Sequence, residues 1–270
     1  MRRRRLLPLI LLAGLTTTLP AHHLFLTLAS FLVRPESSVR VTALDGTFMK
    51  SEHSIARSRI ADLSLVGPAG RKQLDTALVA ADGPRTTIRI QIGPPGTYVA
   101  GLSLRPDTVS LEGAQFDAYL KEEGFDRVLG DRRAKHELGK PVTERRASHG
   151  KAVFQAGSAL GDNWNEVFGY PAEIIPLRNP YALHPGDTLR LELRVARAAA
   201  AGAVAIAGGR SPSGGRIAEQ RLRANGLGVV PVVLRSAGTW YVEFVSVTRS
   251  DDDDANYDAE RATLTFAVPR

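Results

Sequence analysis

The sequence predicts a mainly β protein of two β-sandwich domains with one short helix in the first. Two observations predict this fold class. Apolar and polar residues alternate over many short segments, which is the pattern of half-buried antiparallel strands. Turn-forming pairs such as Asp45-Gly46 and Gly67-Pro68 separate these segments at regular intervals, as in sandwiches of the immunoglobulin-like kind.

The first domain is expected over residues 22–169. Its strands are predicted at 38–44, 59–66, 86–92, 97–104 and 151–155. Between them, apolar residues recur at helical spacing from Leu111 to Val128, which predicts a helix over residues 112–124 with Gly124 as its C-cap. The charged stretch that follows, residues 131–148, is expected to form a long surface loop rather than a second helix.

The second domain is expected over residues 170–270. Alternating segments predict strands at 188–195, 203–207, 216–223, 229–234, 239–247 and 262–268. Six strands are enough for a sandwich of its own. Because the chain has no Cys, neither domain gains stability from disulfides, and thiolate metal ligands are excluded.

The first 21 residues have the features of a signal peptide. Residues 2–5 are all Arg, residues 6–15 form an apolar run, and small residues lead to Ala21. We expect cleavage between Ala21 and His22. The alternative is an uncleaved anchor, but the apolar run is much shorter than the roughly 20 residues that cross a bilayer. We therefore expect a periplasmic or secreted protein without a later membrane span.

Removal of this leader changes the charge argument. The formal charge of +7 falls by four Arg to +3, because the leader contains no acidic residue. The remaining Arg are scattered among nearly as many carboxylates, whereas a nucleic-acid protein needs a basic stripe with interleaved aromatics. Nucleic acid is therefore not an expected partner.

Several segments, in the same order along the chain, resemble a family of exported bacterial proteins. These segments are Ala21-His22-His23-Leu24-Phe25-Leu26, residues 116–124, Glu144-Arg145 with Lys151, residues 171–177, Asn179-Pro180-Tyr181 and His184-Pro185-Gly186-Asp187. The family carries a domain of unknown function and is labelled as the periplasmic component of an ABC-type cobalt or nickel uptake system. The resemblance implies a role in metal uptake with a membrane transporter as partner.

The same resemblance implies a transthyretin-like second domain, since the segment from Asn225-Gly226 to Tyr241 is similar to the strand, turn and closing strand of that group. Two positions depart from the family pattern. Arg146 stands where the family has an aromatic residue, and residues 198–202 replace a short Gly-Lys-Pro turn.

The candidate metal ligands are His22, His23 and His149. If cleavage follows Ala21, the free α-amine and imidazole of His22 can chelate one metal ion, and both groups have pKa values that permit binding near neutral pH. Nitrogen ligands suit copper, nickel and zinc. His149, which precedes an expected strand, is the candidate remote ligand. The alternative is that His22 and His23 only begin the first strand and that His149 is a hydrogen-bonded loop residue.

No enzyme motif stands out, and we do not expect catalysis. Ser148 and His149 are adjacent in an expected strand, so their side chains point to opposite faces. The four aspartates at 251–254 lack the Gly and distal Glu of an EF-hand loop, which favours a solvated loop over a calcium site.

These inferences lead to one functional prediction and one alternative. The prediction is a periplasmic binding or accessory protein for a divalent transition metal (nickel, cobalt or copper), linked to metal uptake. The alternative is a structural or interaction module of the cell envelope that binds a protein or polysaccharide without metal.

Overall fold

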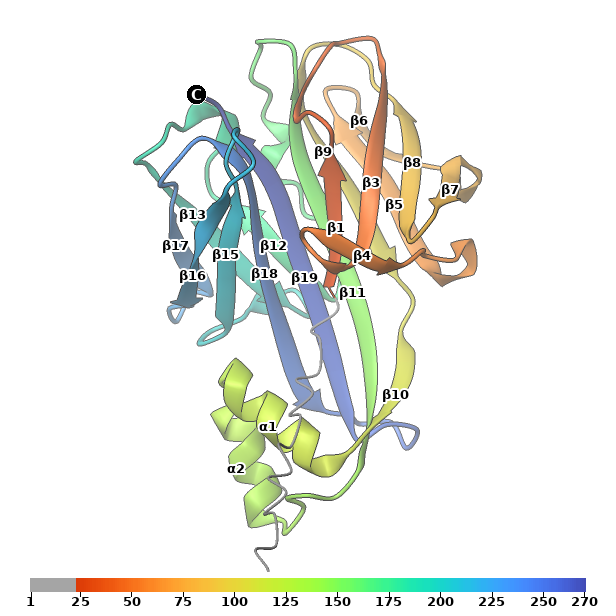
Figure 1. Ribbon diagram of the computed structural model, residues 1–270, viewed down its shortest axis with the longest axis vertical. Coiled ribbons are helices and arrows are strands. Elements are labelled where there is room, and N and C mark those ends of the chain that lie inside the picture. Colours follow the sequence, from red (N-terminus) through yellow and green to blue (C-terminus); the bar gives the residue numbers. More distant parts are fainter. Residues whose placement is uncertain (1–22) are drawn as a thin grey trace, which may run out of the picture.

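Three β-sheets and two α-helices make up residues 23–270, the part of the chain that the computed structural model describes (Figure 1). The expected signal peptide, residues 1–21, and His22 lie outside these residues. No helix within 23–270 is long and apolar enough to span a bilayer. The prediction of a mainly β fold is confirmed, and the packed sheets are consistent with a β-sandwich.

A ten-stranded sheet runs through the centre of the molecule. Its strands follow the order β16 (Arg216–Arg223), β15 (Val204–Arg210), β18 (Gly238–Arg249), β19 (Tyr257–Val268), β11 (Val142–Ala156), β9 (Gly96–Leu104), β5 (Ile60–Gly67) and β6 (Gly70–Gln73), while β10 (Asp107–Leu111) and β2 (Leu32–Val33) also pair with β11. β11 and β19 are parallel neighbours. Strands from both sides of the predicted boundary at residue 170 therefore share one sheet.

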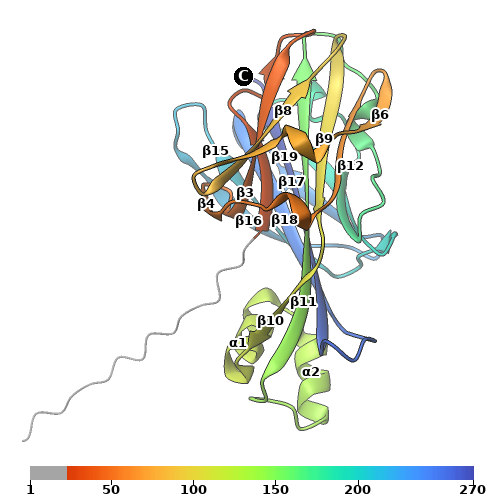
Figure 2. The same cartoon turned by 90° about the vertical axis from the view of Figure 1, so that its right-hand side faces the viewer.

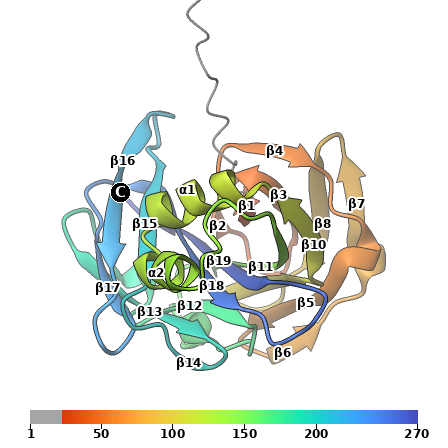
Figure 3. The ribbon, with the colours of Figure 1, turned by 90° about the horizontal axis from the view of Figure 1, so that it is seen from below.

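Two smaller sheets cover opposite faces of the central sheet (Figure 3). One contains β1 (His23–Leu28), β3 (Ser38–Thr47), β4 (Lys50–His53), β7 (Val79–Asp82) and β8 (Arg85–Gln91), and the other contains β12 (Ala172–Pro176), β13 (Thr188–Val195), β14 (Ala198–Ala199) and β17 (Val229–Val233). Successive residues of β11 point to opposite faces. Gly150 faces the sheet of β1, because a Cβ added there would lie 3.0 Å from the Leu24 carbonyl oxygen. The next residue, Lys151, faces the other sheet and donates to Glu173 of β12.

The alternation that predicted the strands also builds the core. In β3 the buried residues include Val39 and Val41, and in β13 they include Leu189 and Leu191. These side chains belong to one apolar cluster with contributions from all three sheets. Burying each such side chain contributes about 1.5–3 kcal/mol, so the core holds the chain on both sides of residue 170 together.

The two helices pack against one end of the long strands, where β11 and β19 begin and β18 ends (Figure 2). α1 spans Gly113–Glu123, close to the predicted 112–124, and ends at Gly124 in the left-handed conformation with a φ of 82°. Phe116 and Leu120 of α1 are buried against Val247 and Tyr257 in a second apolar cluster.

A second helix, α2 (Asp126–Ala134), begins almost at once and overlaps the loop predicted from residue 131. The loop prediction was wrong there because one residue of the charge run is buried. Arg132 is 1% exposed, donates to Asp117 at 2.6 Å and to the Glu137 carbonyl at 2.8 Å, and lies over the Phe116 ring. A residue of the charge run thus faces inward, as do the partly buried Val128 and Leu129 of the same helix.

The strand predicted from Lys151 begins instead at Val142. The charges that suggested a loop are matched by charges on neighbouring strands. Glu144 pairs with Arg261, Arg145 with Asp258, and Arg146 with Asp107. The long-range pairing, which is not visible locally, makes these residues compatible with a strand.

Candidate functional site

The start of β1 is held firmly on the central sheet. β1 pairs with β3 along its length, and the hydroxyls of Thr263 and Thr265 on β19 donate to the carbonyls of Leu24 and Leu26. Glu243 of β18 lies opposite Thr263 in the β18–β19 register, so its side chain shares the face on which β1 lies. This arrangement brings His23 next to Glu243.

His23, which is buried, and Glu243, which is half-buried, form a histidine–carboxyl pair. His23 Nδ1 lies 3.9 Å from Glu243 Oε2, and the Glu243 side chain is 21% exposed. Burial, together with the negative charges of Glu123 and Glu219, raises the pKa of Glu243 to about 8. The Glu243 carboxyl is therefore largely protonated at neutral pH.

A cavity of about 550 Å³ lies beside this pair and reaches Glu243. Its wall includes Phe25, Phe48 and Tyr241, whose rings pack together, with Phe48 and Tyr241 stacked at 4.8 Å. The Tyr241 hydroxyl donates to Glu219, which also pairs with Arg216. The cavity thus combines aromatic walls with two carboxyl groups, those of Glu243 and Glu219.

His149 lies on the opposite face of the central sheet from His23. Its Nδ1 is 2.8 Å from the Ser103 hydroxyl and its Nε2 is 2.8 Å from Glu260 Oε2, while its ring stacks on Tyr170. It is 2% exposed. Both ring nitrogens are therefore engaged within the protein, and the structure does not bring His149 together with His23.

Among residues 23–270 there is no group of three or more His, Asp or Glu side chains placed to hold a metal ion. His23 and Glu243 supply two donors, and His22 lies outside the described part of the chain. Of the aspartates at 251–254, Asp252 pairs with Arg145, in keeping with a surface loop.

Ser103, His149 and Glu260 form a chain of contacts that resembles a serine hydrolase triad. They come from adjacent strands, β9, β11 and β19. In the usual arrangement Nε2 faces the serine, whereas here Nδ1 does. Ser103 is 5% exposed and lines none of the three cavities described for residues 23–270. We interpret the chain of contacts as support between neighbouring strands of the central sheet, and the expectation of no catalysis stays a prediction.

The same buried layer contains Lys151 and Glu173. The Glu173 carboxylate accepts hydrogen bonds from the backbone N–H groups of Phe168 at 2.8 Å and Gly169 at 3.0 Å, and Lys151 donates to it at 3.4 Å. Burial lowers the pKa of Lys151, against the effect of Glu173, which raises it. These contacts anchor the connection into β12.

Sequence reasoning missed Glu243. The available signal was weak: an acidic residue within the expected strand 239–247, on the alternating face that also carries Tyr241. Only the packing of β1 across β19 makes it a neighbour of His23.

Comparison with known proteins identifies a family but no activity. Residues 19–248 match the family described as a domain of unknown function, DUF4198. No curated protein matches the chain. Trypsin-activated alpha-2-macroglobulin from Escherichia coli is similar with 11% identity and a TM-score of 0.22, over 92% of this chain and 16% of that one. For a mutant alpha-2-macroglobulin from Salmonella the values are 12%, 0.22, 92% and 19%.

The chain thus spans less than a fifth of the length of these two structures. At such low TM-scores, neither likeness bears on its fold or function.

Proposed function

The chain belongs to the DUF4198 family, a domain of unknown function, and on that premise we propose that it binds a divalent transition-metal cation at the start of β1. The cation would be nickel, cobalt or copper, and the ligands would be His22, His23 and Glu243. The observation that carries the proposal is the placement of His23 beside Glu243 at the edge of a cavity.

The donor set suits such a metal. An imidazole nitrogen and a carboxylate oxygen are ligands that these ions accept, with geometry and softness deciding among them. Because the Glu243 carboxyl carries a proton at neutral pH, the metal would displace that proton on binding. Consecutive Cα atoms are about 3.8 Å apart, so the amine and imidazole of His22 begin one residue from the pair. Cleavage after Ala21 would therefore complete a site to which the described residues contribute two donors. A bound metal would supply Lewis acidity and charge at this position.

His149 is not part of the proposed site, since its ring is held by Ser103 and Glu260 on the other face of the sheet. The ligand set is therefore more local than a brace closed by a remote histidine. In the proposed site Glu243 takes the place of His149 as the third ligand, because its carboxyl group lies beside His23.

We further propose that the protein acts in the periplasm or outside the cell as an accessory to metal uptake, with a membrane transporter as partner. The support is the signal-peptide pattern of residues 1–21 and the resemblance of the chain to exported proteins with that label. Mass spectrometry of the exported protein should find His22 as its first residue.

Calorimetry with nickel, cobalt, copper and zinc salts tests the metal site in protein that begins at His22. We expect His22→Ala, His23→Ala and Glu243→Gln each to weaken binding by about tenfold or more, as loss of a ligand or its support does. His184→Ala is the matched control, because His184 is exposed and remote in sequence from the site. A correctly processed protein that binds none of the four metals would refute the proposal.

One additional residue placed before His22 makes a sharper variant. It removes the free amine from the chelate while leaving the folded residues 23–270 intact, so metal affinity should fall while the melting temperature of the metal-free protein stays the same. Unchanged affinity would show that the amine is not a ligand.

The alternative function, an envelope module that binds a protein or polysaccharide, is favoured by a separate observation, an unpaired strand edge on β18. Metal dependence separates the two functions. An envelope module should engage its partner equally well after metal is removed with a chelator.

A further inference from the structure

Strand β18 extends beyond its neighbour β15. The β15–β18 register runs from Arg210 opposite Thr239 to Ala205 opposite Phe244, whereas β19 pairs with β18 as far as Arg249. Residues 245–249 of β18 thus have a strand on one side only. Within residues 23–270, no backbone hydrogen bond from outside β19 reaches residues 246–249.

β15 ends at this level because the chain turns away. Gly202 in the preceding turn has a φ of 76°, its N–H donates to the Ala224 carbonyl at 3.1 Å, and its carbonyl accepts from Arg223 at 2.9 Å. These bonds fix the turn beside β16. Between this turn and α2, the line that β15 follows next to β18 therefore carries no strand of the described residues.

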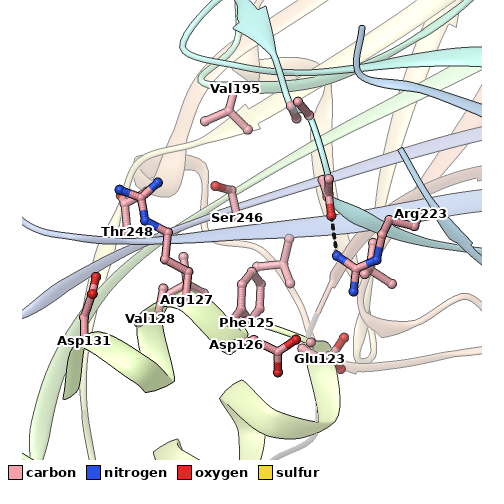
Figure 4. A pocket seen from close by; sticks show the side chains of 18 of the residues that line it. Glu123, Phe125, Asp126, Arg127, Val128, Asp131, Val195, Arg223, Ser246 and Thr248 are labelled. Atoms are coloured by element: carbon pink, nitrogen blue, oxygen red, sulfur yellow. Dashed lines mark hydrogen bonds between the residues drawn. The ribbon is translucent and has the colours of Figure 1, made fainter. Parts of the chain in front are cut away.

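A cavity of about 790 Å³ lies where that line continues, between the helices and the turn (Figure 4). It is lined by all five residues 245–249, by residues 199–204 and by residues of α2 and the α1–α2 connection. Figure 4 shows Arg127 and Thr248 at one end and Glu123 and Arg223 at the other. The unpaired edge of β18 thus lies inside a groove.

The chemistry of this groove fits an extended polypeptide. An open strand edge offers N–H and C=O groups at the spacing of another strand, and proteins usually block such edges with Pro, Lys or a covering element. Residues 245–248 read Val-Ser-Val-Thr and contain no Pro and no charged residue, while Arg249 at the end of the strand pairs with Glu137. Because Phe125 and Val128 line the same groove, alternate apolar side chains of a bound strand would have an apolar surface to contact.

We propose that this edge of β18 binds an extended segment of a partner protein, which adds as a strand in line with β15 and carries apolar residues at alternate positions. Main-chain hydrogen bonds to residues 245–249 would supply affinity, and the groove between α2 and the 199–204 turn would select side chains. The proposal is independent of the metal site, since it uses none of its ligands.

The probes are synthetic heptapeptides of alternating valine and threonine, and versions with lysine or glutamate in place of the threonines. We expect at least one of them to slow amide hydrogen exchange in residues 245–249 by about tenfold or more at saturation. Two N-methylated isomers of the peptide are also compared. Because successive N–H groups of a strand point to opposite edges, methylation of alternate residues blocks one edge in the first isomer and the other edge in the second. One isomer should bind and the other should not, because only one edge faces β18.

A pair of variants of the full chain locates the binding. Ala201→Trp should fill the groove and weaken peptide binding at least about tenfold, which is about 1.4 kcal/mol. Ala198→Trp is the matched control, because Ala198 is equally exposed in the same region but does not line the groove. It should change affinity less than about twofold.

The proposal is overturned if no peptide protects residues 245–249 at millimolar concentration, if protection falls on another edge such as β6, or if both N-methylated isomers bind alike. The isomer comparison uses the unaltered protein, so the test stands even if Ala201→Trp fails to fold.

Discussion

Glu243 is the residue at which burial and charge conflict most clearly. It stands on a central strand, beside His23, with the carboxylates of Glu123 and Glu219 near enough to act on its charge. Its pKa is raised from the ordinary 4.5 to about 8, with burial as the largest cause. In the folded protein it therefore keeps its proton over a pH range in which the unfolded chain releases it.

This difference sets the sign of a pH effect. Between the unfolded pKa of 4.5 and the folded pKa of about 8, the folded state binds more protons, so the free energy of unfolding falls as pH rises through that window. Glu243→Gln removes the titrating group. Relative to the wild type, this variant should gain stability from pH 5 to pH 9, by a few kcal/mol at most.

Urea unfolding at several pH values, with a chelator present, measures this effect. Glu112→Gln, at an exposed position before α1, is the control and should follow the wild type. Parallel pH profiles for Glu243→Gln and the wild type would contradict the assigned burial of Glu243.

At this site the sequence predicted one partner of the pair and not the other. His23 could be predicted because a His-rich start after a signal peptide is visible in the sequence. Glu243 could not, because its proximity depends on β1 crossing β19 more than two hundred residues away in the chain. His149 was predicted to precede a strand, whereas it lies within β11, and the sequence does not reveal that Ser103 and Glu260 hold its ring.

Among the elements, α2 is joined to the rest of the fold by a buried cation, Arg132. Arg132 bonds to Asp117 and to the carbonyls of Glu137 and Lys140, and its guanidinium lies 5.7 Å from the centre of the Tyr257 ring. It therefore joins α2 to α1, to the following loop and to β19. Val128 and Leu129 of α2 also pack against the second apolar cluster but are only partly buried, so the Arg132 contacts add to a small apolar surface.

Arg132→Met should keep the packing of the side-chain stem and lose every hydrogen bond. Removal of one partner leaves the Asp117 carboxylate and two carbonyls without their donor, and we expect a loss of about 3 kcal/mol in the free energy of unfolding. Arg133→Met, at the exposed neighbouring position, should change stability by less than about 0.5 kcal/mol. Denaturant unfolding of the two variants checks this, and equal effects would show that Arg132 does not hold α2.

β13 was predicted with its observed bounds because its residues alternate and it buries one face, and the bounds of β16 were also predicted, although its buried residues do not alternate strictly. α2 and the start of β11 were not, and for a common reason. Both are rich in charge, and a charged segment reads as solvent-exposed unless its partners are known. Arg132 finds Asp117 on another helix, and Arg145 finds Asp258 on another strand.

For the whole molecule, the parallel pairing of β11 with β19 decides how the two parts of the chain unfold. Nine residue pairs, from Glu144 opposite Tyr257 to Ala152 opposite Thr265, join strands from the two sides of residue 170. The buried Arg261–Glu144 and Lys151–Glu173 pairs cross the same boundary. Separation of the parts would expose a central strand edge and leave buried charges without partners, which is costly.

We therefore expect residues 23–270 to unfold in one cooperative transition, although the sequence predicts two sandwich domains. Calorimetry should give a van't Hoff enthalpy of unfolding equal to the calorimetric enthalpy. A fragment ending at residue 169 should aggregate or show no cooperative transition, because its β11 lacks β19 and its core lacks the buried residues of the second part. Two separate transitions, or a fragment that melts cooperatively on its own, would instead establish two independent domains and would mean that the shared sheet contributes little to stability.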